Sequence, residues 1–213
     1  MKKYYCILLI ILFSCNSKFK LKEGDLLFQD LDSSPLCDAI ELVTPGYNDA
    51  NFSHIGLVVS VNDTLKVLEA IPPTVMLTNL DNFLNRSFDK DRNPKVIVGR
   101  LKNKYLHSIK EAVAYSKSKL NIEYDKFFLI NNNAYYCSEL IYEAFLSDSI
   151  FELKPMTFLH PTTKDTLKVW KEYYSKLGIE IPQHKSGINP GTISLSNKIE
   201  IVHSYGIPDG LNY

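Results

Sequence analysis

Residues 53–71 read SHIGLVVSVNDTLKVLEAI, with apolar and β-branched runs on either side of the dipeptide Asn62-Asp63. Valine, isoleucine and threonine favour strands, and neighbouring Asn and Asp residues adopt the backbone conformations of a tight turn. The segment therefore predicts an antiparallel hairpin. His54 and Glu69 lie near the end of this hairpin that is away from the turn. They are the first candidates for chemistry.

The register of the hairpin decides whether these two side chains meet. A turn centred on Asn62-Asp63 places residue 54 opposite residue 71 and leaves Glu69 on the same face, two residues away. A turn centred one residue earlier places Glu69 directly opposite His54, whereas a three-residue turn or a bulge would separate them. A carboxylate beside an imidazole fixes its tautomer and stabilises the imidazolium, as a catalytic base requires. The alternatives are a buried structural histidine and a solvent-facing carboxylate.

A second candidate lies in residues 136–140, which read YCSEL. Apolar residues follow Cys137 at spacings of three, four and seven, so a predicted helix over residues 136–145 carries Cys137 on its inward face. The free N–H groups and the dipole at a helix N-terminus favour the thiolate, which is the nucleophilic form. On position alone, a buried structural cysteine is the more common case.

The rest of the chain supplies short strands and interspersed helices. Strands are predicted over residues 24–28, 95–101 and 199–202, and helices over residues 35–43, 108–120 and 163–177. The segment Ser108-Ile109-Lys110-Glu111 fits a capping box at the start of the second of these helices. This order of elements favours an α+β fold over a doubly wound sheet.

Composition excludes several classes of protein. The chain has 213 residues, and its 24 Lys and Arg residues balance 24 Asp and Glu residues, which argues against nucleic-acid binding. The five histidines lack paired ligand spacing, so no metal site is predicted, and the chain contains no Gly-x-Ser-x-Gly motif. No repeat or long linker divides the sequence, and one domain is predicted over residues 24–213.

The first residues have the features of a secretion signal. Lys2 and Lys3 precede an apolar run over residues 4–13, which Ser14 and Cys15 end. A small residue followed by cysteine resembles a bacterial lipobox. We therefore expect a signal peptide over residues 1–14, lipidation of Cys15 and a tether over residues 15–23; the alternative is an ordinary cleaved signal. The expected location is extracytoplasmic, with a lipid anchor in a bacterial membrane, at the periplasm or the cell surface.

Taken in order, these motifs resemble the permuted papain-like hydrolases of the NlpC superfamily, in the YiiX/YebB-like branch. The matching segments are Gly24 to Phe28, Ser53 to Leu57, Glu69-Ala70, Tyr124-Asp125, Tyr136 to Leu140 and the later turn Asn189-Pro190-Gly191. Papain itself has its cysteine before its histidine. Here His54 precedes Cys137, and this inverted order is the mark of the permuted group.

The resemblance implies an antiparallel β-barrel packed against the helix that carries the nucleophile. It implies Cys137 as the nucleophile, His54 as the acid–base and Glu69 as the residue that orients the ring, with no cofactor. The backbone N–H of Cys137 would hold the oxyanion. Tyr124 and Asp125 are candidates for binding a substrate ammonium group; the alternative is a turn tyrosine and a capping aspartate.

The expected substrate is a small peptide or a murein fragment, cleaved at an amide bond. A thioesterase or acyltransferase acting on lipid or acyl esters is the alternative within the same fold, and a non-catalytic binding lipoprotein is another. A disulfide between Cys37 and Cys137 would silence the site, since extracytoplasmic compartments are oxidising. Without that disulfide, Cys37 is interpreted as a small packed residue.

Overall fold

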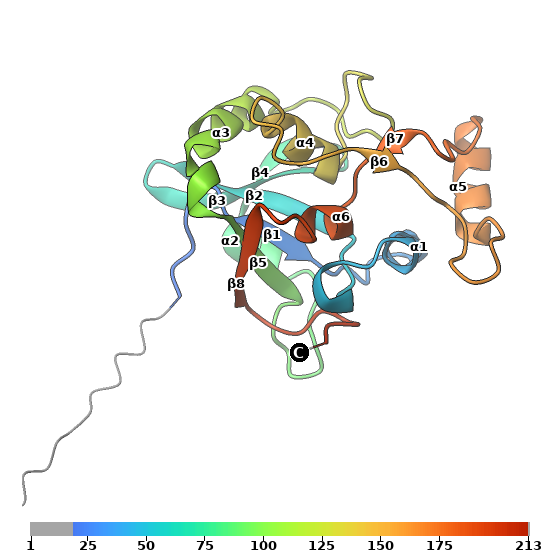
Figure 1. Ribbon diagram of the computed structural model, residues 1–213, viewed down its shortest axis with the longest axis horizontal. Helices are drawn as coiled ribbons and strands as arrows, with labels where there is room; N and C mark the ends of the chain where they lie inside the picture. Colours follow the sequence, from blue (N-terminus) through green and yellow to red (C-terminus); the bar gives the residue numbers. More distant parts are fainter. Residues whose placement is uncertain (1–18, 213) are drawn as a thin grey trace, which may run out of the picture.

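The computed structural model describes residues 19–212, which form a six-stranded antiparallel sheet with helices on both of its faces (Figure 1). The strand order is β4-β3-β2-β1-β5-β8. These strands are β1 (Leu26–Gln29), β2 (His54–Val61), β3 (Thr64–Ile71), β4 (Thr74–Asn79), β5 (Val96–Leu101) and β8 (Ile199–Ser204). A separate pair consists of β6 (Lys154–Pro155) and β7 (Ser186–Gly187).

Six α-helices and two 3-10 helices accompany the strands in the described residues. The α-helices are α1 (Pro35–Val43), α2 (Leu80–Leu84), α3 (Ile109–Ser118), α4 (Cys137–Ala144), α5 (Lys168–Leu177) and α6 (Pro190–Ser194). The 3-10 helices are η1 (Tyr47–Asp49) and η2 (Asn103–Ser108). Within residues 19–212, no helix combines the length and the apolar character needed to cross a bilayer.

The two faces of the sheet build two separate cores. On one face, Leu57 and Leu68 pack with Leu140 and Ile141 of α4 in the main core. On the other face, Phe83 of α2 packs with alternate strand residues such as Val58 and Val67. His54 is the first residue of β2, so it lies at the end of the sheet, where α4 on one side and α2 on the other both come near.

A third cluster builds a lobe at one side of the molecule, where Figure 1 shows α5 standing apart from the sheet. Trp170 and Tyr174 lie one turn apart on the inner face of α5 and are both buried. Trp170 packs edge-on against Phe158 with 4.9 Å between ring centroids, and against Phe128 at 6.0 Å. This lobe forms one wall of the pocket described below.

The predicted α+β class and the predicted hairpin are confirmed. Val61 pairs with Thr64, so the turn is Asn62-Asp63, and both turn residues have the positive φ values of a tight hairpin, 49° and 59°. The expected barrel is not closed: within the described residues, β4 and β8 are the opposite ends of the sheet order.

Helix and strand limits differ from the predictions in three instructive places. Strand β4 was not predicted, because the pair Pro72-Pro73 before it reads as a break in the sequence. Helix α5 begins at Lys168, five residues later than residue 163. The capping box at Ser108 was wrong: Ser108 is helical and ends η2, so the chain enters α3 from a preceding helical turn.

Candidate active site

Cys137 is the first residue of α4, and Tyr136 before it is in an extended conformation. The start of α4 leaves backbone N–H groups without intrahelical partners, and the helix dipole places partial positive charge beside the sulfur. The side-chain carboxyl group of Glu139 accepts a hydrogen bond from the Tyr136 N–H at 3.4 Å, which fixes this helix start. Cys137 and Cys37 are both free thiols, so the structure contains no disulfide between them.

His54 and Glu69 meet across the β2–β3 hairpin. Under the observed register, residue 54 corresponds to position 71, and Glu69 reaches the imidazole from two residues away on the same face. The His54 Nε2 lies 2.5 Å from Glu69 Oε2, and both side chains are buried. Because Nε2 is engaged by Glu69, Nδ1 is the ring nitrogen that remains for Cys137, whose side chain is close enough to act on the pKa of His54. The structure thus brings together the three residues predicted from the sequence.

Two further side chains hold Glu69, and the sequence analysis missed both. Arg86 donates from Nη1 to Oε2 at 2.8 Å and from Nη2 to Oε1 at 2.6 Å, and Thr78 donates from its hydroxyl to Oε1. Thr78 lies on the unpredicted strand β4, and Arg86 follows α2. Neither residue shows a spacing signal in the sequence; a prediction of β4 would have identified Thr78 as a cross-strand neighbour.

The electrostatics of the site favour an imidazolium. Burial by itself lowers the pKa of His54, but the hydrogen bonds to Cys137 and Glu69 outweigh burial and raise that pKa to about 9. Burial acts to raise the pKa of Glu69, but the hydrogen bonds from Arg86 and His54 lower it to about 2. His54 is therefore protonated and Glu69 ionised at neutral pH, and a positively charged ring stands beside the Cys137 thiol. A cationic ring beside a cysteine at a helix N-terminus is the surrounding typical of a reactive cysteine.

Cys137 opens into a pocket with a mainly apolar lining. Aliphatic side chains of α1 form one wall and aromatic side chains of the α5 lobe form another: Ile40, Val43, Tyr124, Phe128, Phe158 and Trp170. Ser53, which precedes His54, also lines it. The space beside the Cys137 sulfur is therefore suited to an apolar group.

The third wall joins α4, the helix that begins with Cys137, to α6. Ser138 donates from its hydroxyl to the Ile188 carbonyl at 2.9 Å, and the Ile188 N–H donates to the Tyr136 hydroxyl at 3.2 Å. Gly191 in α6 lies so close to α1 that a Cβ there would come within 2.2 Å of the Thr44 carbonyl oxygen. Glycine at this position lets α1 and α6 close this wall around Cys137.

Tyr124 and Asp125 occupy different environments. Tyr124 lines the pocket, where its ring packs edge-on against Phe128. Asp125 is buried, and its carboxylate accepts the N–H groups of Phe127 and Leu129, both at 2.7 Å. The aspartate is thus engaged in ordering its own loop. The role predicted for the pair, binding a substrate ammonium group, stays a prediction.

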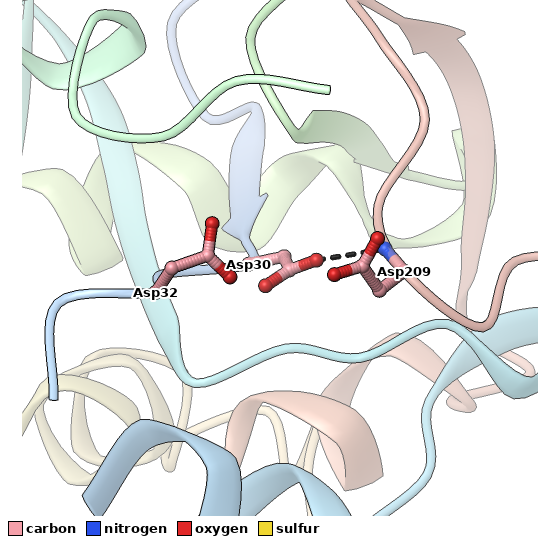
Figure 2. A group of neighbouring side chains, drawn as sticks. All are labelled: Asp30, Asp32 and Asp209. Carbon is pink, nitrogen blue, oxygen red and sulfur yellow. Dashed lines mark hydrogen bonds between the residues drawn. The ribbon is translucent and has the colours of Figure 1, made fainter. Parts of the chain in front are cut away.

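Three aspartates gather outside the lining of this pocket: Asp30 and Asp32 after β1, and Asp209 near the C-terminus (Figure 2). Their oxygens are close enough to hold a cation, but the chain supplies its own. The buried ammonium of Lys95 lies 3.0 Å from Asp30, 2.7 Å from Asp32 and 3.2 Å from Asp209. The Asp209 N–H also donates to Asp30 at 2.7 Å, so the cluster ties the C-terminal segment to the end of β1.

A family model described as permuted papain-like amidase enzymes, YaeF/YiiX, C92 family, matches residues 20–203. The chain belongs to this amidase family. Family C92 enzymes are cysteine peptidases or amidases, so the protein is a hydrolase of that class. This agrees with the resemblance stated from the sequence.

A solved structure similar to this C92 chain is that of the metalloprotein YiiX from Escherichia coli O157:H7. The TM-score is 0.72 and the identity 21%, and the match covers 88% of this chain and 99% of that one. At this identity the match shows that the two proteins share a fold. No curated protein matches the chain significantly.

Proposed function

We propose that this C92 amidase cleaves its substrate through an acyl-enzyme on Cys137. The observation that carries the proposal is the contact of 2.5 Å between His54 Nε2 and the Glu69 carboxylate, in a site where Cys137 at the start of α4 is close enough to raise the pKa of His54. A buried thiol, a charged imidazole and an ionised orienting group are the parts that nucleophilic amide cleavage requires. A purely structural cluster would not require a cysteine at the start of a helix.

The reaction proceeds in two halves. The Cys137 thiolate bonds to the substrate carbonyl carbon, and the oxyanion that forms accepts hydrogen bonds from backbone N–H groups at the start of α4. The C–N bond then breaks, and the leaving amine takes the proton of the His54 imidazolium. In the second half, His54 takes a proton from water and the hydroxide attacks the thioester carbonyl. The C–S bond then breaks, the carboxylic acid leaves, and the Cys137 thiolate and the His54 imidazolium are restored.

We propose small peptides, including murein fragments, as the substrate class. The apolar lining around Cys137 favours an apolar residue on the acyl side of the scissile bond. Tyr124 at the pocket wall is a candidate contact for the amine end of such a peptide. The proposed reaction uses no metal or other cofactor, because the Cys137–His54 pair supplies both nucleophile and proton donor.

A thioesterase or acyltransferase acting on acyl esters is the second candidate. The same apolar pocket favours it, since an alkyl chain also suits a lining of aliphatic and aromatic side chains. The two candidates share their acylation chemistry and differ in the leaving group, which is an amine in one and a thiol or alcohol in the other.

We also propose that lipid on Cys15 anchors the protein to a bacterial membrane. Cys15 lies outside the described residues, four positions before Phe19, so the anchor would hold Phe19 within about 14 Å of the bilayer. The Phe19 ring stacks on His203 with 4.1 Å between centroids, and the Lys20 carbonyl accepts from Arg100. This end of the chain lies on the side remote from α5 (Figure 1). The pocket would therefore face away from the anchoring bilayer, which favours soluble peptides over its lipids.

The test compares leaving groups and acyl groups in one set of assays. Peptide amides with an apolar or an acidic acyl-side residue, murein peptides, and acyl thioesters are offered to wild type, Cys137→Ala and Cys37→Ala. We expect turnover of apolar peptide amides by wild type and Cys37→Ala, and none by Cys137→Ala. Turnover of thioesters without any amide would favour the second candidate. Turnover that survives in Cys137→Ala would refute the acyl-enzyme.

A further inference from the structure

We propose that Arg86 is a positioning residue of this site: its guanidinium fixes the carboxylate of Glu69 so that the His54 ring presents Nδ1 to Cys137. The inference rests on the proposed function, because it takes Cys137 and His54 as the catalytic pair. It adds a residue from outside the sequence motifs and assigns to it a measurable effect on the nucleophile.

The contact between Arg86 and Glu69 is a bidentate ion pair. The two N–H···O distances are 2.8 Å and 2.6 Å, one to each carboxylate oxygen. The Glu69 side chain is completely buried, while 22% of the Arg86 side chain is exposed. A planar guanidinium that holds both oxygens fixes the plane of the carboxylate as well as its position, which a single charge such as lysine does not do.

A count of acceptor sites shows why this plane matters. An ionised carboxylate has about four lone-pair directions. Oε2 accepts from His54 and Arg86, and Oε1 accepts from Arg86 and Thr78. All four lone-pair directions are thus used. The direction that receives His54 Nε2 is set by the two hydrogen bonds from Arg86 and the one from Thr78. Without Arg86, only Thr78 and His54 itself would hold the carboxylate, so its plane, and with it the direction of the ring toward Cys137, would be less firmly fixed.

The segment that carries Arg86 also supports the ring itself. Phe83 of α2 packs against His54 with 5.7 Å between ring centroids, and the Arg86 guanidinium lies over the Phe83 ring at 5.1 Å. Gln29, which pairs with His54 across β1 and β2, donates to the Phe83 carbonyl at 2.7 Å. The segment from α2 to Arg86 therefore contacts both the ring and the carboxylate that orients it.

Removing Arg86 should change how the site responds to pH. The groups that face Glu69 are His54 from β2, Thr78 from β4 and Arg86, and beyond His54 lies Cys137 from α4. Burial raises the pKa of Glu69, and Arg86 is the first of the groups that oppose this. In a variant without Arg86, Glu69 should gain a proton at higher pH than in wild type. As pH falls, the His54 imidazolium then loses the negative charge of Glu69 that stabilises it, and Cys137 in turn loses the cationic ring beside it.

The chain offers a matched control in Arg100. This arginine makes the same kind of paired contact with Asp25, at 2.7 Å to each oxygen. Asp25 is buried and 18% of the Arg100 side chain is exposed, much as in the Arg86 pair. Arg100→Met should therefore remove a comparable structural contact in the same sheet without touching the site.

The experiment measures the rate at which iodoacetamide alkylates Cys137 in the full chain between pH 2.5 and pH 9, by peptide mass spectrometry. This range includes the pKa expected for Glu69 without Arg86, about one to two units above the wild-type value of about 2. For Arg86→Met, the acidic limb of the rate profile should move up by about one to two pH units, because losing an opposite charge shifts a carboxyl pKa by that amount. Arg100→Met should keep the wild-type profile. Arg86→Lys keeps the positive charge but cannot bind both carboxylate oxygens. Its rate profile should lie between those of Arg86→Met and Arg100→Met.

Three outcomes would overturn the proposal. The first is a wild-type acidic limb in folded Arg86→Met. The second is an equal shift in Arg100→Met, which would mark a general effect of lost stability. If Arg86→Met does not fold, Arg86→Lys decides, and a profile identical to wild type counts against the proposal. A wild-type Cys137 that reacts no faster than Cys37 would instead refute the proposed function itself.

Discussion

Glu69 reaches His54 diagonally across the β2–β3 hairpin, with 2.5 Å between the carboxylate Oε2 and the imidazole Nε2. The two residues are not directly paired in the ladder; they share a face and are offset by two positions. This offset leaves room for Thr78 and Arg86 to reach the same carboxylate. The ring is therefore oriented by a carboxylate that is itself held from two other segments.

Glu69→Gln should lower turnover about ten- to a thousandfold, because the amide keeps its shape but loses the charge that stabilises the imidazolium. The loss should be smaller than in a serine hydrolase, since a thiolate forms readily. The measurement is turnover against pH for the folded variant, with Thr78→Val as the control that removes a neighbouring contact without the charge. Near-wild-type turnover in Glu69→Gln would contradict the orienting role.

Glu69→Gln should also destabilise the fold. From the sequence, Glu69 is a strand-end carboxylate whose loss should matter little to stability when it is partly exposed. The structure shows a completely buried side chain in an ion pair with Arg86. We therefore expect a loss of about 1–3 kcal/mol in the free energy of unfolding, since the guanidinium loses its charged partner. Urea denaturation measures this, and an unchanged midpoint would contradict it.

The hairpin, helix α4 with Cys137 at its start, and the meeting of His54 with Glu69 are all local consequences of sequence. Period-two patterning places Glu69 on the His54 face under either two-residue turn considered, and the spacing of apolar residues after Cys137 indicates the inward face of α4. The partner of such a pair is predictable when a short turn connects the two strands. That is why these residues could be identified without a structure.

The rest of the site depends on contacts between segments far apart in the chain. Arg86 lies 17 positions from Glu69 beyond an unpredicted strand, and the wall at Ile188 meets Ser138 across 50 positions. The pocket combines α1 with the α5 lobe. The amphipathic pattern of each helix shows that one of its faces is buried, but it does not show which segment packs against that face. Tertiary packing decides such contacts, and a single sequence does not show which distant segments pack together.

Gly191→Ala should loosen the wall between α1 and α6. Its Cβ would lie 2.2 Å from the Thr44 carbonyl oxygen, and backbone on both sides leaves little freedom to move. We expect a loss of about 1–3 kcal/mol in stability, as for overpacking of a tight contact, together with reduced turnover. Gly178→Ala is the matched control: it has open space but a φ of 70°, so it should lower stability modestly and leave turnover unchanged. Equal turnover in both variants would contradict a role for this wall.

Stability should depend on pH through His54. Burial alone lowers the pKa of His54, but its bonds to Cys137 and Glu69 raise it from 6.5 to about 9 in the folded protein. A raised pKa adds stability that is fully present below pH 6.5 and is lost as pH rises toward 9. Wild type should therefore lose on the order of 2 kcal/mol across this window. His54→Gln should lack this loss. Parallel pH profiles of the two proteins would contradict the assignment.

Lys95→Met should be among the most damaging changes outside the active site. The ammonium is buried and contacts the buried carboxylate of Asp30 at 3.0 Å, along with two exposed carboxylates. Removing it leaves Asp30 with an uncompensated buried charge, so we expect a loss of about 3–5 kcal/mol in the free energy of unfolding. Asp32→Asn is the matched control. Its side chain is 59% exposed, and loss of an exposed partner should change stability by at most about 1 kcal/mol.

Because Asp209 also contacts Lys95, the C-terminal segment should detach first in Lys95→Met. Faster proteolysis near residue 209 would report this. Similar denaturation midpoints for Lys95→Met and Asp32→Asn would mean that the buried ammonium is not what ties the C-terminal segment to the end of β1.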